Sequence, residues 1–311
     1  MAVDKTESTI KTVALCGASG FVGQAILKAL SESGRFDVTV LTRSTHSNGN
    51  DHVKSDRVKY KQVDYDSVDS LTDALRAQDA VVSAIGKGDT ARIQHNLIDA
   101  AVAAGVKHFI PSEFGADLKN TKISAFPIYK GKVALEAYLE EAASKSRLIY
   151  TYIYNNVILD FGLRVGSILD FKTNTIRIYD GGAHKFSTST LSPISQAVVQ
   201  ILLQPEKFSN RPVRISEVAI SQQRLLEIAK KLEPSKEWTV VPVSSAQLVQ
   251  DVQEEAAKGI FSLRVFNAYA IRGAFAPDFG CLYENNDNNA LGISELTEPE
   301  LEQYLARLVR Q

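Results

Sequence analysis

Three glycines near the N-terminus have the spacing of a phosphate-binding turn, because Gly17, Gly20 and Gly23 recur at every third residue. A pyrophosphate needs backbone N–H groups that no side chain obstructs, and it gains from the positive end of a helix dipole. The pattern predicts a cofactor turn, and the alternative is a tight turn with a structural role only. The expected contacts come from Gly17, Ser19, Gly20, Phe21, Val22 and Gly23.

A strand and a helix are predicted on either side of these glycines. The run 13–16 is apolar, and the residues after Gly20 place apolar side chains on one helical face. Further strands are predicted at 37–42, 58–63, 79–85, 106–110 and 148–154, with helices between most of them. This alternation predicts an α/β fold, a doubly wound parallel sheet (Rossmann) with a smaller mixed α/β C-terminal substrate lobe. The expected domains are residues 1–155, which bind NADP(H), and 156–311, which form mainly the substrate lobe, with some elements returning to the sheet.

The end of the second predicted strand indicates which nicotinamide cofactor binds. An acidic residue there would suit the ribose 2′-hydroxyl of NAD, whereas this chain has Arg43, Ser44 and Thr45. A guanidinium and two hydroxyl groups suit a 2′-phosphate, so we expect NADPH and contacts from Arg43 and Ser44. The alternative is a solvated surface arginine. A polar loop over residues 45–55 follows, and we expect it to be mobile.

Two asparagines follow the strand predicted at 148–154. Asn155 and Asn156 lie at the edge of the sheet where open α/β folds bind ligands. Their amides would orient the nicotinamide carboxamide or the substrate, although asparagine is also a common turn residue. Both readings stay open at this point.

Composition excludes several classes of function. The chain has 311 residues, a formal net charge of −1 and two cysteines, Cys16 and Cys281. We therefore expect no nucleic-acid or membrane partner, no disulfide framework and no metal site. The first ten residues are polar and include Asp4 and Glu7, which predicts neither a signal peptide nor a transit peptide and favours the cytoplasm. The expected partner is a small-molecule substrate, and the expected state is a monomer or a homodimer.

Three stretches resemble one known family. They are the run from Phe109 to Gly115 (FIPSEFG), then Lys130, and then the run from Tyr152 to Asn156 (YIYNN). Together they are similar to the isoflavone reductase group, with the pinoresinol-lariciresinol and phenylcoumaran reductases, within the NmrA-like branch of atypical short-chain dehydrogenases. The resemblance extends from the glycine turn to about the C-terminal helix.

The resemblance implies that a lone lysine is the catalytic residue. A standard short-chain dehydrogenase has a tyrosine four residues before its lysine, but Phe126 occupies that position before Lys130. Partly desolvated and close to the nicotinamide, Lys130 would have a lowered pKa and act as general acid/base. The alternative is a solvent-facing lysine in the first turn of a helix over 130–144. Neighbouring Tyr129 and Lys132 would point elsewhere on such a helix.

Further contacts are also implied by the resemblance. Ile85, Gly86 and Lys87 follow the fourth strand, where the family's chain passes the cofactor ribose. Phe114 would pack beside the nicotinamide, and Glu113 would either contact the cofactor or hold its loop. The cofactor set is therefore completed by Ile85, Gly86, Lys87, Glu113, Phe114, Lys130, Asn155 and Asn156. The expected substrate contacts are Phe114, Tyr154, Asn156 and Phe161.

The second half has weaker patterns. A strand over 175–180 is expected to form a hairpin with 185–190 across Gly181 and Gly182. Helices are predicted at 193–203, 222–232, 246–257, 262–269 and the C-terminus, and strands at 213–215 and 239–243. His184 is expected to be exposed on its turn. Core packing is the expected role of four aromatic residues, and the alternative is an aromatic pocket: Phe161, Phe266, Tyr269 and Phe275.

Two departures from the family pattern affect the substrate. The segment after the lysine reads Val133 to Glu136 (VALE) where plant members usually have basic residues, and the segment 191–194 lacks the acidic residue expected at the start of its helix. We therefore expect an NADPH-dependent reductase of a small aromatic, enone or polyketide-like substrate. The alternatives are a non-catalytic NADP(H)-sensing regulator and a redox-neutral lyase or isomerase that retains the cofactor.

Overall fold

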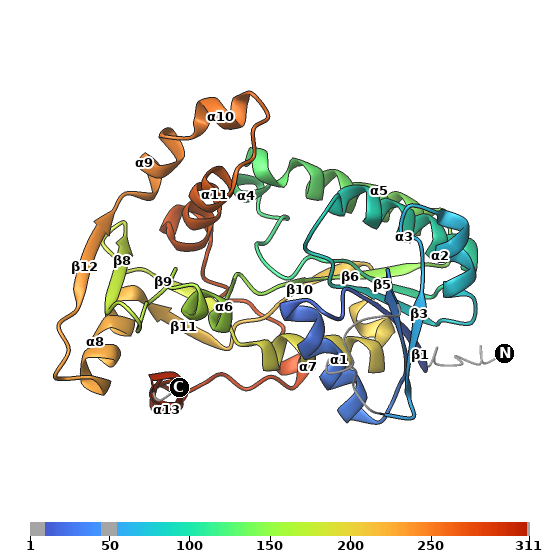
Figure 1. Ribbon diagram of the computed structural model, residues 1–311, viewed down its shortest axis with the longest axis horizontal. Coiled ribbons are helices and arrows are strands. Elements are labelled where there is room, and N and C mark those ends of the chain that lie inside the picture. Colours follow the sequence, from blue (N-terminus) through green and yellow to red (C-terminus); the bar gives the residue numbers. More distant parts are fainter. Residues whose placement is uncertain (1–9, 45–54, 310–311) are drawn as a thin grey trace. The chain divides into compact units, whose positions relative to one another are not determined.

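A computed structural model describes residues 10–44 and 55–309 of the chain (Figure 1). The expected mobile loop and most of the polar N-terminal segment lie outside these residues. The chain divides into two compact units. The first comprises residues 1–114, 134–153 and 194–213, and the second comprises 115–133, 154–193 and 214–311. This division differs from a single boundary after residue 155, because the chain passes between the units several times. The assignment of functions to the domains stays a prediction.

The first unit is built on a seven-stranded sheet in the order β10-β6-β5-β4-β1-β2-β3. The neighbouring pairs from β6 to β3 run parallel, which confirms the predicted doubly wound sheet. The strands are β1 (Thr12–Cys16), β2 (Asp37–Thr42), β3 (Val58–Gln62), β4 (Ala80–Ser83), β5 (His108–Ile110), β6 (Ile149–Tyr154) and β10 (Arg211–Arg214). The order reverses between β1 and β4, and ligands of such folds bind at the carboxyl ends of strands at this point.

Helices cover both faces of this sheet. In Figure 1, α2, α3 and α5 lie on one side, and α1 and α7 lie on the other. The central strands are therefore covered on both faces, and every residue of β4 and β5 is buried. Gly105 ends α3 in the left-handed conformation with φ 74°. The helices are α1 (Phe21–Ser33), α2 (Val68–Leu75), α3 (Thr90–Ala104), α5 (Lys130–Ser144), α7 (Leu191–Leu203) and η2 (Pro205–Phe208), and the first residues of α5 and α7 belong to the second unit.

The second unit combines two small sheets with short helices around its own core. One sheet has the order β11-β9-β7, and the other pairs β12 with β8. The strands are β7 (Val157–Ile158), β8 (Thr175–Tyr179), β9 (Lys185–Ser189), β11 (Val218–Ser221) and β12 (Thr239–Val243). The helices are α4 (Thr121–Ser124), η1 (Pro127–Tyr129), α6 (Leu159–Arg164), α8 (Gln222–Leu232), α9 (Ser245–Gln250), α10 (Gln253–Ala257), α11 (Leu263–Phe275), η3 (Pro277–Phe279), α12 (Asn288–Leu291) and α13 (Glu298–Val309).

The predicted hairpin between β8 and β9 is wrong. β8 pairs in parallel with β12, whereas β9 pairs with β11 and β7. Asp180, Gly181 and Gly182 all have positive φ, so the chain turns away instead of folding back. Asp180 is fixed in this turn by the end of β12 and by the start of α9. Its N–H donates to the carbonyl of Val243, the last residue of β12, and its carboxylate accepts from the Ser245 N–H. The partner of β8 therefore comes from about 60 residues later in the chain.

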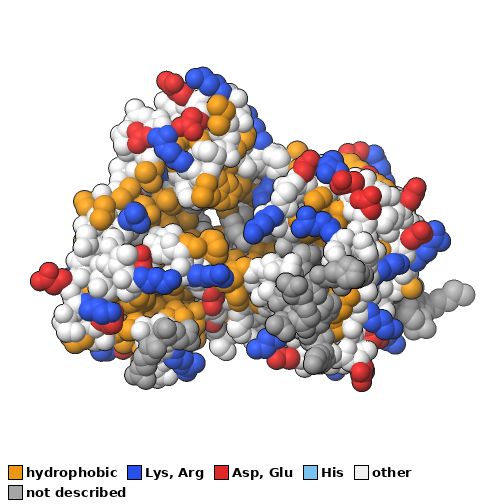
Figure 2. Space-filling view, in the orientation of Figure 1, with side chains coloured by type: hydrophobic (Ala, Val, Ile, Leu, Met, Phe, Trp, Pro, Cys, Tyr) orange, Lys and Arg blue, Asp and Glu red, His pale blue; other side chains and the backbone are white. Residues whose placement is uncertain are grey.

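Three observations concern the surface charges, the helix lengths and the candidate metal ligands of the described residues. Basic and acidic side chains are interspersed over the face drawn in Figure 2, and the formal net charge of the whole chain is −1. No helix within residues 10–44 and 55–309 is long and apolar enough to cross a bilayer. The same residues contain no group of three or more candidate metal ligands.

Candidate functional site

The glycine turn follows β1 and leaves no room for a side chain at its first residue, Gly17. Gly17 has φ +81°, and a Cβ atom on it would lie 2.6 Å from the backbone oxygen of Ala84. The N–H of Ala84 in turn donates to the Cys16 carbonyl at 2.8 Å. The turn and the segment after β4 are therefore in backbone contact, and only glycine fits at position 17.

The other two glycines allow α1 to start against this turn. The Gly20 N–H donates to the Gly17 oxygen at 2.9 Å, and a Cβ atom on Gly23 would lie only 2.1 Å from the same oxygen. No side chain caps α1 at Gly20, and its first turn contains no acidic residue. The helix therefore presents a positive N-terminus that suits an anion. Ser19 lies in this turn, and Phe21 and Val22 are the first two residues of α1.

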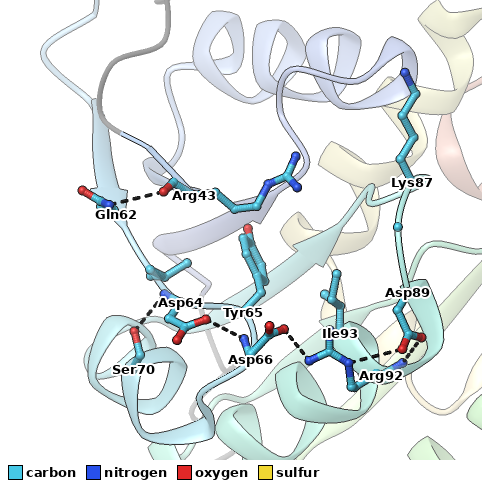
Figure 3. Close-up of a pocket in the computed structure, with 12 residues that line it drawn as sticks. Arg43, Gln62, Asp64, Tyr65, Asp66, Ser70, Lys87, Asp89, Arg92 and Ile93 are labelled. Carbon is cyan, nitrogen blue, oxygen red and sulfur yellow. Dashed lines mark hydrogen bonds and ion pairs between the residues drawn. The ribbon is translucent and has the colours of Figure 1, made fainter.

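The residues after β4 lie beside the turn. Ile85 is half-buried, and Gly86 and Lys87 are exposed. Lys87 also lines a cavity of about 580 Å³ formed by segments that follow β2, β3 and β4 (Figure 3). All of these segments belong to the first unit. The cavity lies at the carboxyl edge of the sheet, where the fold is expected to bind its ligand.

The carboxylates around this cavity are engaged with partners from the protein. Asp64 accepts a hydrogen bond from the Asp66 N–H at 2.9 Å. Arg92 forms ion pairs with Asp66 and with Asp89, and Asp89 also caps α3 by accepting from the Arg92 N–H. Figure 3 shows this chain of contacts along one side of the cavity. One guanidinium is therefore shared by two of the three carboxylates, and the third is bound by a backbone N–H.

Two cations that line the cavity form no ion pair with a carboxylate of the described residues. Within residues 10–44 and 55–309, neither Arg43 nor Lys87 forms an ion pair with a carboxylate. In Figure 3 the Arg43 side chain extends from the end of β2 over Tyr65. Ser44 is exposed next to it, and Thr42 accepts from the Ser44 N–H at 3.3 Å. Thr45 lies outside the described residues.

Tyr65 is a cavity residue that sequence reasoning missed. Its hydroxyl donates to the Leu41 carbonyl at 2.9 Å, which ties the segment after β3 to β2. Burial is the main cause that raises the pKa of Tyr65, and the neighbouring Cys16 thiol adds to the effect. Cys16 itself is fully buried, as predicted, and burial raises the pKa of its thiol to about 12. The sequence feature that could have identified Tyr65 is its position shortly after the parallel strand β3.

The loop after β5 holds Glu113 inside the first unit. Glu113 is 2% exposed, and its N–H donates to the Pro111 carbonyl at 2.8 Å. The preceding Ser112 N–H donates to the side chain of buried Gln94 at 2.9 Å. Phe114 is partly buried at the end of this loop. The roles of Glu113 and Phe114 toward a cofactor stay predictions.

Lys130 begins α5 at the predicted residue and is exposed. The position four residues earlier is occupied by Phe126, whose ring packs on Tyr269 and Phe279 with centroid distances of 5.1 and 5.0 Å. Tyr129 is buried. Among residues 10–44 and 55–309, no acidic side chain forms an ion pair with Lys130. Its exposure agrees with the alternative of a solvent-facing lysine, and its role in proton transfer stays a prediction.

The strand end at Tyr154 has a clear structural role in the second unit. Tyr154 and Asn155 are fully buried, and the Asn155 amide donates to the Asn156 carbonyl at 3.1 Å. Asn156 has φ +51°, and its side-chain amide donates to the carbonyls of Ser187 and Cys281 at 3.0 and 3.1 Å. These bonds join segments that are distant in sequence. Contacts of the three residues with cofactor or substrate stay predictions.

The four aromatic residues of the second unit divide into two pairs. Tyr269 and Phe275 are 6% and 7% exposed, which confirms the expected core packing. The same expectation is wrong for Phe161 and Phe266, which are 49% and 45% exposed. Each lies on the outer face of its helix, α6 or α11. His184 is exposed, as predicted.

The acidic residue missing from the start of α7 is replaced from other segments. The Leu191 N–H donates to the Asp160 carboxylate, and the Thr190 N–H donates to Glu217, both at 2.7 Å. Burial raises the pKa of Glu217, and the Asp160 charge adds to this effect, while its hydrogen bonds to Thr190 oppose it. Sequence reasoning missed both carboxylates because they lie 31 and 27 residues from the N–H groups that they bind at the start of the helix.

Comparisons with known proteins identify the family. The NmrA-like family model matches residues 9–287. The chain belongs to the NmrA-like family. The oxidoreductase aprR of Aspergillus flavus is 30% identical over 308 residues, which cover 97% of this chain and 99% of that protein. The phenylcoumaran benzylic ether reductase IRL1 of Ginkgo biloba is 29% identical over 157 residues, about half of either chain. By its full-length similarity this NmrA-like protein is an oxidoreductase.

Solved structures show the same fold. An isoflavone reductase aligns with a TM-score of 0.74 and 19% identity over 96% of this chain and all of its own. The pinoresinol reductase AtPrR2, solved with NADP⁺ and (+)-pinoresinol, aligns with a TM-score of 0.70 and 20% identity over 96% and 94%. The resemblance to isoflavone reductases and their Rossmann fold is therefore confirmed.

Proposed function

We propose that this NmrA-like protein is an NADPH-dependent reductase of a small aromatic, enone or polyketide-like substrate. The observation that carries the proposal is the glycine turn, where a Cβ atom on Gly17 or Gly23 would overlap backbone atoms. Such a turn, followed by the uncapped N-terminus of α1, fits a pyrophosphate. The residues present therefore fit a dinucleotide, with Ser19, Gly20 and Val22 supplying the nearby backbone.

The charges of the adjoining cavity favour NADPH over NADH. Its carboxylates are engaged with Arg92 or with backbone groups, whereas Arg43 and Lys87 have no recorded acidic partner among the described residues. A guanidinium binds a phosphate through paired charge-assisted hydrogen bonds. We therefore assign the 2′-phosphate to Arg43, with Ser44 beside it.

Lys130 is assigned the proton transfer. When bound, the nicotinamide supplies a hydride to an electrophilic carbon of the substrate. The Lys130 ammonium donates its Nζ proton to the atom that receives the electron pair, a carbonyl oxygen or the carbon α to it, and is reprotonated from solvent. Phe126 has no proton to give, so the phenol of a standard short-chain dehydrogenase is absent from that position.

The substrate class is inferred from aromatic side chains and from the relatives. Phe161 presents half of its surface to solvent, and Phe114 is partly buried. Relatives that match about half of this chain are reductases of aromatic plant compounds by name, and the full-length relatives are fungal oxidoreductases. We assign Phe114, Phe161, Tyr154 and Asn156 to the substrate side.

The test combines cofactor binding with turnover. The dissociation constants of NADPH and NADH are measured by fluorescence titration, and oxidation of NADPH is followed at 340 nm with acetophenone, benzylideneacetone and trans-chalcone. We expect tighter binding of NADPH than of NADH and oxidation with at least one probe. Tight NADPH binding without oxidation by any probe would overturn the reductase proposal and favour the sensing regulator. Equal affinity for both cofactors would overturn the assignment of Arg43.

A further inference from the structure

The helix α6 presents an apolar face to solvent. Phe161 and Val165, four residues apart, are 49% and 53% exposed. The opposite side is anchored, because Leu159 is fully buried and a Cβ atom on Gly162 would lie 2.3 Å from the side chain of Ile168. Contiguous exposed apolar side chains are a candidate binding face.

A helix this short depends on tertiary contacts for its position. α6 has six residues, and its N-cap, Ile158, makes no side-chain capping bond. Isolated helices shorter than about 12 residues are marginal in water. The groups that bind α6 from outside therefore determine where Phe161 lies.

Asp160 links α6 to two other elements through its carboxylate. One carboxylate oxygen accepts from the Leu191 N–H at 2.7 Å, at the start of α7. The other oxygen accepts from the Tyr304 hydroxyl at 2.8 Å, on α13. Burial and the adjacent Asp160 charge raise the pKa of Tyr304, so its hydroxyl stays protonated and remains a donor at neutral pH.

The helix α13 is itself firmly attached. Leu301 and Leu305 are buried in the core of the second unit, and Glu302 binds Lys231 of α8 through both oxygens, at 2.9 and 2.7 Å. Tyr304 therefore extends from a fixed support. This helix lies beyond residue 287, where the match to the family model ends.

We infer that Tyr304 and Asp160 are positioning residues that hold α6 so that its Phe161 face contacts the aromatic substrate. The inference rests on the proposed function, which assigns Phe161 to the substrate side. Tyr304 acts through Asp160 and does not touch the substrate. Its loss changes substrate binding and leaves the cofactor unaffected.

The first measurement is amide hydrogen exchange of residues 159–165 in the full chain. Tyr304→Phe removes one hydroxyl and keeps the ring, so we expect exchange about fivefold faster, as for loss of a hydrogen bond worth about 1 kcal/mol. Glu302→Gln is the matched control, because it weakens the Lys231 contact on the same helix without touching Asp160. Equal exchange in wild type and Tyr304→Phe, or an equal rise in the control, would overturn the inference.

The second measurement is steady-state kinetics with NADPH and whichever of the three probes wild type reduces. We expect Tyr304→Phe to raise the KM of the probe about fivefold, with kcat and the dissociation constant of NADPH within about twofold of wild type. Phe161→Ala should raise the same KM, and the double variant should add little to it. Turnover with an unchanged KM in Tyr304→Phe would overturn the inference and leave the proposed function standing. No turnover by wild type would overturn the proposed function and the substrate role of α6, while exchange would still decide whether Tyr304 holds the helix.

Discussion

The two units of the chain hold their functional groups by different means. In the first unit, the glycine turn is formed by backbone groups within a few residues of one another, beside the backbone of the neighbouring strand. In the second unit, side chains bridge distant segments: Asn156 binds a carbonyl 125 residues away, and Tyr304 binds Asp160 across 144 residues. The first arrangement depends on a short stretch of sequence, and the second depends on residues that lie far apart in the chain.

The largest expected effect concerns the glycine turn. Gly17→Ala should weaken NADPH binding more than about 100-fold, because its Cβ overlaps the Ala84 backbone and the turn must open. Gly34→Ala is the matched control, since Gly34 also has positive φ but a Cβ there meets nothing within 4 Å. The measurement is the dissociation constant by fluorescence titration. Similar constants for the two variants would contradict the importance of close backbone approach.

The second prediction concerns the frame of the second unit. Asn156→Gly keeps the positive φ but removes the amide that binds the Ser187 and Cys281 carbonyls. Leaving two carbonyls without this donor should lower the free energy of unfolding by about 2–4 kcal/mol. Asn174→Gly serves as control, because Asn174 has positive φ and its side-chain oxygen has no recorded hydrogen bond within the described residues. Urea unfolding is the measurement, and equal losses in both variants would refute the bridging role.

The third prediction concerns cofactor choice within the first unit. Arg43→Ala should raise the dissociation constant of NADPH about 10–100-fold, as for loss of a charge-assisted hydrogen bond worth about 1.5–3 kcal/mol. The constant for NADH should stay within about twofold. Arg35→Ala tests specificity, because Arg35 is exposed near the opposite end of β2. An equal effect of Arg43→Ala on both cofactors would show that it does not bind the 2′-phosphate.

The smallest expected effect is acid sensitivity of the sheet in the first unit. His108 is fully buried, and burial lowers its pKa from 6.5 to about 3. The Thr151 hydroxyl donates its proton to the Phe208 carbonyl at 2.7 Å. His108 Nε2 lies 2.8 Å from the Thr151 oxygen and therefore donates to it. With its lowered pKa, the imidazole ring is neutral at pH 7. The unfolded chain takes up a proton below pH 6.5 and the folded chain does not, so stability is complete above pH 6.5 and falls as pH decreases toward 3.

For this histidine the expected loss is about 2 kcal/mol between pH 7.5 and pH 5. His108→Gln keeps a donor for Thr151 and does not titrate. The free energy of unfolding of wild type should therefore fall about 2 kcal/mol further than that of the variant over this interval. Parallel pH dependences would show that the ring is protonated in the folded chain.

The sequence allowed most of the first unit to be predicted, because its signals are local. The glycine turn between β1 and α1 and the strands β2, β4 and β5 lie within the expected ranges. The second unit was harder, since β8 finds its partner β12 far along the chain. In the same way, the carboxylate that binds the start of α7 comes from Asp160, which no local pattern reveals. Solvent exposure of Phe161 also depends on this distant packing.

The most direct test of the reductase account is the rate of hydride transfer in a Lys130 variant. Lys130→Ala should lower kcat about 100–10,000-fold, the usual contribution of a general acid or base, and leave the dissociation constant of NADPH within about threefold. Lys132→Ala, two residues along the same helix, should retain wild-type turnover. The measurement is NADPH oxidation at 340 nm with a probe that the wild-type protein reduces. Full turnover by Lys130→Ala would contradict the account.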